Sequence, residues 1–240
     1  VSLLAVVAKA APIFVCIELM ENGDLREFLR GCRPKKACAS SARMPRASSQ
    51  QPRAQITPRI MVLMAAKLGS AMAFLEQHHI IHRDVAARNV LVGAGAIDVK
   101  LADLGAARSV HRISEGSDNG VYTATSDHTP ARWMPLEALR EAKFSHKSDM
   151  FAFGVVLWEI LTLGQTPWGA FGVPDFTRAL AEGKRLVFPP ALKHGFDDEE
   201  THAAAAGYAI AVRCWNGNPA KRPHFHQLEA EFAVHCTVQA

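Results

Sequence analysis

The stretch HRDVAARN, residues 82–89, decides how this chain is interpreted, because it gathers two cations, a carboxylate and an amide where an apolar pattern stops. Upstream of it, Thr57 and Pro58 are typical of the N-cap and the first position of a helix. Apolar side chains then recur at helical spacing, at Ile60, Leu63, Met64, Leu68, Met72 and Leu75. A long amphipathic helix is therefore expected to lead directly into the charged cluster.

Short strands are expected on both sides of this region. The segments NVLVG (89–93) and IDVKLAD (97–103) resemble two strands around a glycine turn. Near the start of the chain, residues 3–7 and 13–19 are short apolar runs compatible with a hairpin. The strands are few and short, so the sequence predicts an α+β fold in which helices dominate.

Helices are expected to make up most of the remaining chain. The segment NGDLREFLR (22–30) predicts a short helix with Asn22 or Asp24 as its cap. From Glu137 onward the pattern is mostly helical, and residues 149–163 are apolar on nearly every side. A helix of that kind belongs in the centre of a domain.

The positive charge of the chain is confined to one segment. The 240 residues are 49% hydrophobic, enough for a sizeable core, and carry a net charge of +4. Between residues 31 and 59 there are seven cations and no acidic residue, which leaves a net charge of 4 − 7 = −3 elsewhere. These cations are Arg33, Lys35, Lys36, Arg43, Arg46, Arg53 and Arg59. We therefore expect no nucleic-acid surface, and we predict a disordered basic insert at about 31–57, rich in Ser, Ala, Pro and Arg.

Cysteine usage and hydropathy favour a cytoplasmic location. Five cysteines form no C-x-x-C pair, which fits reduced thiols. No signal peptide is expected from VSLLAVV (1–7), and the apolar stretch at 150–164 is short and contains Glu159. We expect no membrane segment in this chain.

Six motifs in fixed order resemble the eukaryotic protein kinases, and within them the receptor-type tyrosine kinases. They are VCIELMENGDL (15–25), similar to the hinge between lobes; HRDVAARN, the catalytic loop; ADLG (102–105), the metal-binding D-F-G; PARWMPLEAL (130–139), the docking loop ending at A-P-E; SDMFAFGVVLWEI (148–160), the buried central helix; and CWNGNPAKRPHF (214–225), the closing element. The resemblance implies a kinase-like fold, with residues 1–20 as a remnant of the N-lobe and residues 21–240 as the C-lobe. It also implies transfer of the γ-phosphoryl group of ATP, with Mg²⁺, to tyrosine in protein substrates.

The resemblance assigns roles to individual residues. Phosphoryl transfer needs groups that position a hydroxyl and neutralise developing charge. Asp84 would orient the substrate hydroxyl, Arg88 would approach a phenolic substrate, and Asn89 and Asp103 would bind Mg²⁺. The nucleotide site would also include Glu18, Met20 and Leu91. Arg83 and a phosphorylated Tyr122 would be regulatory. The structural residues would be His82, Glu137, Asp149 and Arg222, with Glu137 and Arg222 forming a buried ion pair.

The tyrosine assignment rests on A-A-R at residues 86–88, where serine/threonine kinases typically carry a lysine two residues after the aspartate, and on the later RWM. Two departures from the family pattern, Leu104 in DLG and Leu136 in PLE, leave all charged groups in place, and Leu104 is expected to pack as an apolar residue.

A larger departure lies before the hinge. No glycine precedes Gly23, and Lys9 is the one lysine upstream of Glu18. These 240 residues alone are therefore expected to be inactive, and the alternative function is that of a truncated kinase or pseudokinase acting as a binding module. The resemblance leaves open a receptor or a soluble parent protein.

Several histidines could suggest zinc. His78 and His82 have the i,i+4 spacing of helical ligands, but no further Cys or acidic ligand follows nearby in the sequence. The expectation is a packing role for His82, and surface or core positions for His224 and His226.

Overall fold

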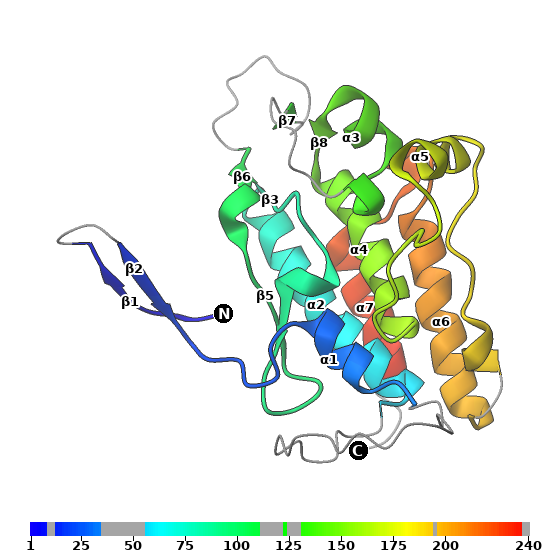
Figure 1. The fold of residues 1–240 in the computed structure, drawn as a ribbon, viewed down its shortest axis with the longest axis horizontal. Helices are drawn as coiled ribbons and strands as arrows, with labels where there is room; N and C mark the ends of the chain where they lie inside the picture. Colours follow the sequence, from blue (N-terminus) through cyan, green and yellow to red (C-terminus); the bar gives the residue numbers. More distant parts are fainter. Residues whose placement is uncertain (9–12, 35–55, 111–121, 124–130, 194–195, 237–240) are drawn as a thin grey trace, which may run out of the picture.

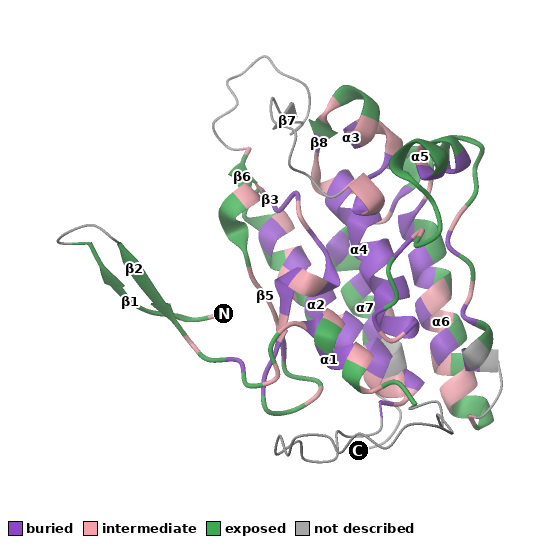
Figure 2. Ribbon diagram, in the orientation of Figure 1, coloured by how far each residue is buried: buried purple, intermediate pink, exposed green. Residues whose placement is uncertain are grey.

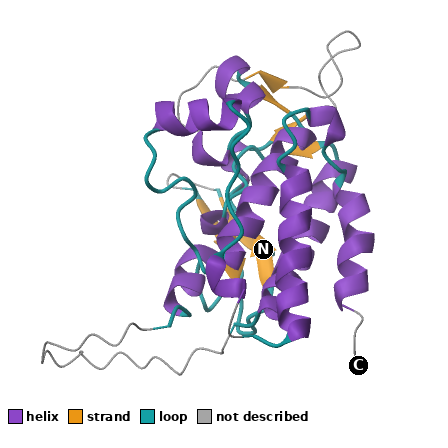
Figure 3. Cartoon of the chain, turned by 90° about the vertical axis from the view of Figure 1, so that its right-hand side faces the viewer, coloured by secondary structure: helices purple, strands orange, loops and turns teal. Residues whose placement is uncertain are grey.

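Helices form the body of the molecule, and the strands are short antiparallel pairs (Figures 1 and 3). The computed structural model describes residues 1–8, 13–34, 56–110, 122–123, 131–193 and 196–236. Its helices are α1 (Leu25–Gly31), α2 (Pro58–Gln77), α3 (Leu136–Glu141), α4 (His146–Leu161), α5 (Val173–Ala181), α6 (Asp198–Cys214) and α7 (Phe225–Cys236). Its strand pairs are β1 (Leu3–Val7) with β2 (Phe14–Ile17), β3 (Ile80–Ile81) with β6 (Arg108–Ser109), β4 (Val90–Val92) with β5 (Val99–Leu101), and β7 (Tyr122–Thr123) with β8 (Lys143–Phe144).

Helix α4 is the centre of the core. Ser145 and Ser148 form a capping box that fixes where the helix begins. Every residue from Ser148 to Leu161 is buried, as the apolar sequence predicts (Figure 2). The helix is surrounded by α2, α6 and the loops that precede it. Close approach is possible because Gly154 has no side chain: a Cβ there would lie 2.7 Å from Cβ of Cys214 and Nε1 of Trp215.

Helix α2 brings the chain to the charged cluster. The Thr57 hydroxyl accepts a hydrogen bond from the amide of Ile60, and Pro58 opens the helix, so the predicted start is confirmed. The helix packs along α7 and α6. By length and composition α2 could cross a membrane, but half of its most apolar stretch is buried inside the molecule, as in the core helix of a globular domain.

The β1–β2 hairpin extends away from the helical body (Figure 1). Its strands pair in antiparallel register from Leu3 opposite Ile17 to Val7 opposite Phe14, with an irregularity between Leu3 and Ala5, so the expected hairpin is confirmed. All nine strand residues are exposed, and most of them are apolar.

Three sequence expectations can be compared with the local geometry. Helix α1 is capped by Asp24, which accepts from the amide of Glu27, whereas the Asn22 side chain donates to the carbonyl of Gly93. The predicted insert, at about 31–57, begins where α1 ends at Gly31 and finishes at Thr57, the cap of α2; residues 35–55 lie outside the described residues, so the insert stays a prediction.

The third comparison concerns the histidines at the end of α2. The helix ends at Gln77, and His79 has a φ of 55°. His78 and His82 therefore do not share a helical face, which removes the geometric basis of the i,i+4 zinc pair.

Candidate active site

The catalytic loop is anchored to the core by Asp149 of α4. Its two carboxylate oxygens accept hydrogen bonds from the backbone amides of His82, at 2.7 Å, and Arg83, at 2.9 Å. Arg83 has a φ of 71°, an uncommon conformation that this double anchor holds in place. Burial raises the pKa of Asp149 to about 7, although both amide donors act in the opposite direction. The sequence expectation of a structural role agrees with this position.

His82 links the catalytic loop to the segment before Asp103. The imidazole is completely buried, its Nε2 lies 3.2 Å from the carbonyl oxygen of Ala102, and its Nδ1 lies 3.3 Å from the amide nitrogen of Asp84. Burial lowers the pKa of His82, so the ring is held neutral. The expected packing role agrees with this environment.

Asp84 is held between two side chains of its own loop. Arg88 forms an ion pair with its Oδ1, and Nδ2 of Asn89 donates to its Oδ2 at 2.7 Å and to its carbonyl oxygen at 2.8 Å. Asp84 is half-buried and Asn89 is buried. The predicted catalytic residues are thus brought together around one carboxylate, in an orientation that their hydrogen bonds define.

Asp103 and Asn89 form the part of the site that could hold a metal ion. The amide of Ala102 donates to the carbonyl of Asn89 at 2.8 Å, which sets Asp103 beside the catalytic loop. Asp103 is exposed, with a φ of 59°, and its carboxylate accepts from the amide of Gly105. Because Nδ2 of Asn89 faces Asp84, its Oδ1 is the atom offered to an ion. An amide oxygen and a carboxylate are hard donors, so these residues fit Mg²⁺.

Leu104, beside Asp103, departs from expectation. The sequence predicted that it packs as an apolar residue, but it is 55% exposed. It begins a 3₁₀ turn (Leu104–Ala106) that follows the left-handed Asp103, so its side chain points away from the core residues.

The hinge residues lie beside β4 and β5. The Glu18 carboxylate binds Nζ of Lys100 with both oxygens at 2.9 Å and accepts from the Ser2 amide at 2.6 Å. The Lys100 ammonium lowers the pKa of Glu18. The Glu18 side chain is therefore engaged within the protein, and a nucleotide would be left with backbone groups of the hinge. Met20 is buried and Leu91 is half-buried, which fits the apolar edge of an adenine site.

Glu159 joins the catalytic loop to the docking loop, a connection that the sequence alone does not predict. Its Oε2 accepts from the backbone amide of Ala87 at 3.0 Å and from Nε1 of Trp133 at 2.7 Å. The Arg88 guanidinium lies over the Trp133 ring, 4.7 Å from its centroid. Burial raises the pKa of Glu159 to about 7, against its two hydrogen-bond donors. The sequence feature that could have indicated this connection is Glu159 itself, the single acidic residue in the apolar stretch 150–164.

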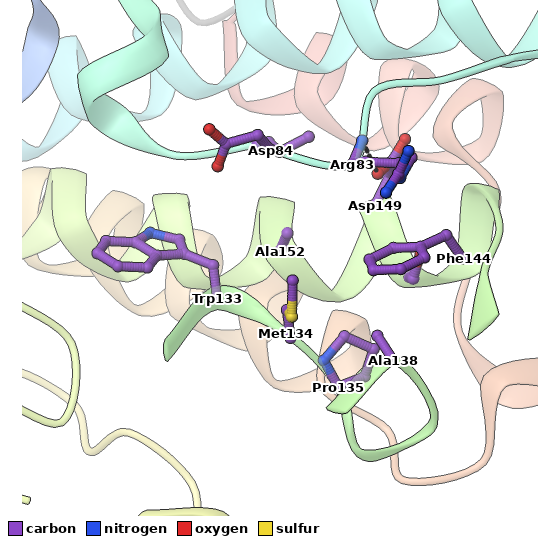
Figure 4. A pocket seen from close by; sticks show the side chains of 11 residues that line it. Arg83, Asp84, Trp133, Met134, Pro135, Ala138, Phe144, Asp149 and Ala152 are labelled. Atoms are coloured by element: carbon purple, nitrogen blue, oxygen red, sulfur yellow. Dashed lines mark hydrogen bonds between the residues drawn. The ribbon is translucent and has the colours of Figure 1, made fainter. Parts of the chain in front are cut away.

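A small cavity lies between the catalytic loop and the docking loop (Figure 4). Asp84 and Trp133 lie on one side of it, and Arg83, Asp149 and Phe144 lie on the other. Its volume is about 10 Å³, room for about one water molecule. This space is therefore part of the packing beneath the site, and a substrate side chain would have to approach Asp84 from outside.

The predicted ion pair between Glu137 and Arg222 is confirmed. Nη1 and Nη2 of Arg222 lie 2.6 and 3.2 Å from the two carboxylate oxygens of Glu137. Arg222 is 2% exposed and also donates to the carbonyls of Lys147 and Asn216. One buried guanidinium thus ties α3, α4 and the segment before α7 together.

The predicted regulatory residues lie near one another along the backbone. The Arg83 guanidinium sits 4.7 Å from the centroid of the Phe144 ring. Tyr122 pairs with Phe144 between β7 and β8. The Tyr122 side chain lies outside the described residues, so its role stays a prediction.

Comparison with known proteins agrees with the ordered motifs and with this geometry. Residues 1–232 match the family model of the protein tyrosine and serine/threonine kinases. The chain is 36% identical over 231 residues to the Myoblast growth factor receptor egl-15 of Caenorhabditis elegans; the match covers 91% of this chain and 20% of that receptor. The chain therefore spans about a fifth of the length of this relative. It belongs to the protein tyrosine and serine/threonine kinase family.

Proposed function

We propose that this chain is part of a protein-tyrosine kinase that transfers the γ-phosphoryl group of ATP to tyrosine side chains of other proteins. The observation that carries the proposal is the Asp84 carboxylate, which Arg88 and Asn89 hold beside the Asn89–Asp103 pair of hard oxygen donors. A carboxylate oriented next to metal-binding groups can accept a hydroxyl proton as the oxygen attacks phosphorus.

The proposed reaction gives each residue of the candidate site a role. Asp84 orients the tyrosine hydroxyl and takes its proton, while Asn89 and Asp103 hold Mg²⁺. When held by these residues, Mg²⁺ would supply positive charge against the phosphates. Arg88 supplies a positive charge beside the reacting hydroxyl, and Met20 and Leu91 contact the adenine. Asp149 and Glu159 contribute indirectly, because their hydrogen bonds fix the backbone of the catalytic loop.

Tyrosine is favoured over serine by the arrangement around Arg88. Ala86, two residues after Asp84, is completely buried and offers no cation. The cation of this loop is Arg88, whose side chain extends between Asp84 and the Trp133 ring. A long, flat phenol could lie along this surface and reach Asp84, whereas a short serine side chain would have to bring its own backbone closer.

Further assignments follow from the proposed function. We assign residues 1–20 to the end of the N-lobe and the hinge, and residues 21–240 to the C-lobe. A phosphate on Tyr122 would carry about −1.5 to −2 charges, and Arg83, near the β7–β8 pair, would be its partner. We place the domain on the cytoplasmic side, which fits the free thiols of Cys16 and Cys214.

Phosphate transfer to a tyrosine-containing polymer, with a serine polymer as comparison, tests the proposal in the full protein that carries this chain. Asp84→Asn should lower kcat on the order of 10²–10⁴-fold, because the proton acceptor is lost. The control is Asp98→Asn, which neutralises an exposed carboxylate between β4 and β5 and should leave kcat unchanged. Equal phosphorylation of serine, or an unaltered kcat in Asp84→Asn, would contradict the proposal.

The alternative function, a binding module without catalysis, is favoured by two observations. Residues 1–23 supply no glycine-rich loop to cover a triphosphate before the hinge, and Lys100 is engaged by Glu18. These 240 residues alone should accordingly show weak Mg-ATP binding and no detectable transfer. Strong Asp84-dependent turnover by the 240-residue chain would exclude this alternative.

A further inference from the structure

Three side chains with metal-ligating atoms converge at the C-terminal end of α2. Glu76 belongs to the last turn of α2, and His224 and His226 flank the first residue of α7. Nδ1 of His224 lies 3.0 Å from Oε1 of Glu76, and Nδ1 of His226 lies 3.8 Å from Oε2. One ligand atom from each residue can be chosen so that all three lie within 4.8 Å of one another.

Local structure explains why these groups meet. Phe225 is fully buried and its ring packs edge-on against Phe153, with centroids 5.5 Å apart. This anchor leaves the residues on either side, His224 and His226, exposed at the surface. Their rings are stacked, with centroids 5.5 Å apart and an angle of 24° between planes. Both imidazole rings therefore lie beside the same carboxylate, that of Glu76.

The carboxylate is fixed independently of the histidines. Oε2 of Glu76 accepts a hydrogen bond from the backbone amide of Phe225 at 2.9 Å, so Glu76 caps the start of α7 from another helix. The Glu76 side chain is 15% exposed. One of the three ligands is thus already oriented, which reduces the entropy lost when an ion binds.

We propose that Glu76, His224 and His226 bind a divalent transition-metal ion such as Zn²⁺. Imidazole nitrogen and carboxylate oxygen are ligands that Zn²⁺ takes, and three protein ligands leave a fourth position for water. In a tetrahedral site with bonds of about 2.0–2.1 Å, ligand atoms are about 3.3 Å apart. His224 lies 3.0 Å from Oε1 of Glu76 and His226 lies 3.8 Å from Oε2. One atom from each residue can be chosen within 4.8 Å of the others, so rotation of the exposed imidazoles would bring the three ligand atoms to the tetrahedral separation.

A simple ion pair accounts for only part of this geometry. It explains His224 beside Glu76, but Nδ1 of His226 lies beyond hydrogen-bonding distance of the same carboxylate. His146 adds a third imidazole near this carboxylate: burial lowers the pKa of His146, while the charge of Glu76 acts in the opposite direction.

An ion at this position would join the C-terminal end of α2 to the start of α7. Helix α2 leads into β3 and the catalytic loop, and it packs along α7. An ion that binds the folded state and not the unfolded state would stabilise the protein, by an amount that grows with the logarithm of the ion concentration once this exceeds Kd. None of the three ligands is among the residues to which the proposed transfer reaction assigns a role.

Titration calorimetry with ZnCl₂ on the 240-residue chain tests the proposal, with thermal unfolding in the presence of zinc or of a chelator as a second measurement. The parent should bind one Zn²⁺ that raises its melting temperature. His226→Gln, His224→Gln and Glu76→Gln should each weaken that binding at least about tenfold. Glu76→Gln keeps an oxygen acceptor for the Phe225 amide, so it separates the metal site from the helix cap.

His202→Gln is the matched control, because it removes an exposed histidine of α6 and should leave zinc affinity unchanged. Equal melting temperatures of the parent and the histidine variants in chelator would show that folding is intact. The proposal is overturned if the parent binds no Zn²⁺, or if the His224→Gln, His226→Gln double variant binds it as tightly as the parent, which would locate the ion on other groups.

Discussion

The Glu159 carboxyl group is buried in the core, yet its pKa controls how stability depends on pH. Its pKa is raised from 4.5 to about 7 in the folded protein. Between these values the folded state binds more protons than the unfolded state, so the free energy of unfolding falls as pH rises from 4.5 to 7. A shift of this size corresponds to about 3 kcal/mol.

Glu159→Gln should remove that contribution and keep an oxygen acceptor for Ala87 and Trp133. Denaturant unfolding between pH 5 and 7 should give a flatter profile for the variant than for the parent. Asp149, whose raised pKa acts in the same direction, is present in both proteins and cancels in the difference. Parallel profiles would show that Glu159 does not titrate in this range.

Arg222 should be far more important for stability than an arginine in a surface ion pair. Arg222→Leu leaves Glu137 and two backbone carbonyls without their cation, and breaking a buried pair costs about 3–5 kcal/mol. The matched control is Arg213→Leu, which breaks an exposed pair with Glu231, typically worth about 0–1 kcal/mol. Unfolding midpoints in urea measure both changes, and equal losses would contradict the distinction.

At the scale of elements, two glycines in the helices should respond oppositely to alanine. In α4, Gly154→Ala would place a methyl group 2.7 Å from Cys214 and Trp215, and overpacking of this kind costs about 1–3 kcal/mol. In α2, Gly69→Ala would meet the rings of Phe232 and Phe153 at 3.4 and 3.6 Å, which is ordinary contact. The better helix propensity of alanine should then stabilise the protein by up to about 1 kcal/mol. Thermal unfolding of the two variants should show shifts of opposite sign.

Sequence alone predicts those elements whose signals are local. Periodicity and capping residues are sufficient for α2, and a stretch that is apolar on nearly every side is sufficient for α4. Eight consecutive residues contain Asp84, Arg88 and Asn89. The hydrogen bond from Ala87 to Glu159 spans 72 positions, and the contact of Glu76 with His224 spans 148. No periodicity relates residues so far apart, so these contacts emerge only from the packing of the helices.

The exposure of Leu104 was mispredicted for a related reason. Its environment depends on the left-handed conformation of the preceding Asp103, and the letters DLG do not reveal that conformation.

At the scale of the whole molecule, the projecting hairpin should govern self-association of the 240-residue chain. Leu4, Val6 and Val15 are more than half exposed, and a contiguous apolar surface of this kind favours association. Replacing all three with threonine should reduce concentration-dependent association in sedimentation velocity, while the helical body should keep its unfolding midpoint. Threonine at Val187 and Val212, exposed valines of the helical body, is the control. Unchanged association of the hairpin variant would contradict the prediction.

The central position of α4 also has a consequence for synthesis on the ribosome. When residues 1–145 have emerged, α2 is complete, but the helices that cover its apolar side, α4, α6 and α7, have not yet been made. Met64, Leu68 and Met72, which are buried in the finished protein, then remain in contact with water. Phe232 of α7 packs on Phe153 of α4, so the core closes only when translation reaches the last helix. The nascent chain therefore exposes these apolar side chains until α7 has been made, and molecular chaperones are the cellular factors suited to protecting it from aggregation.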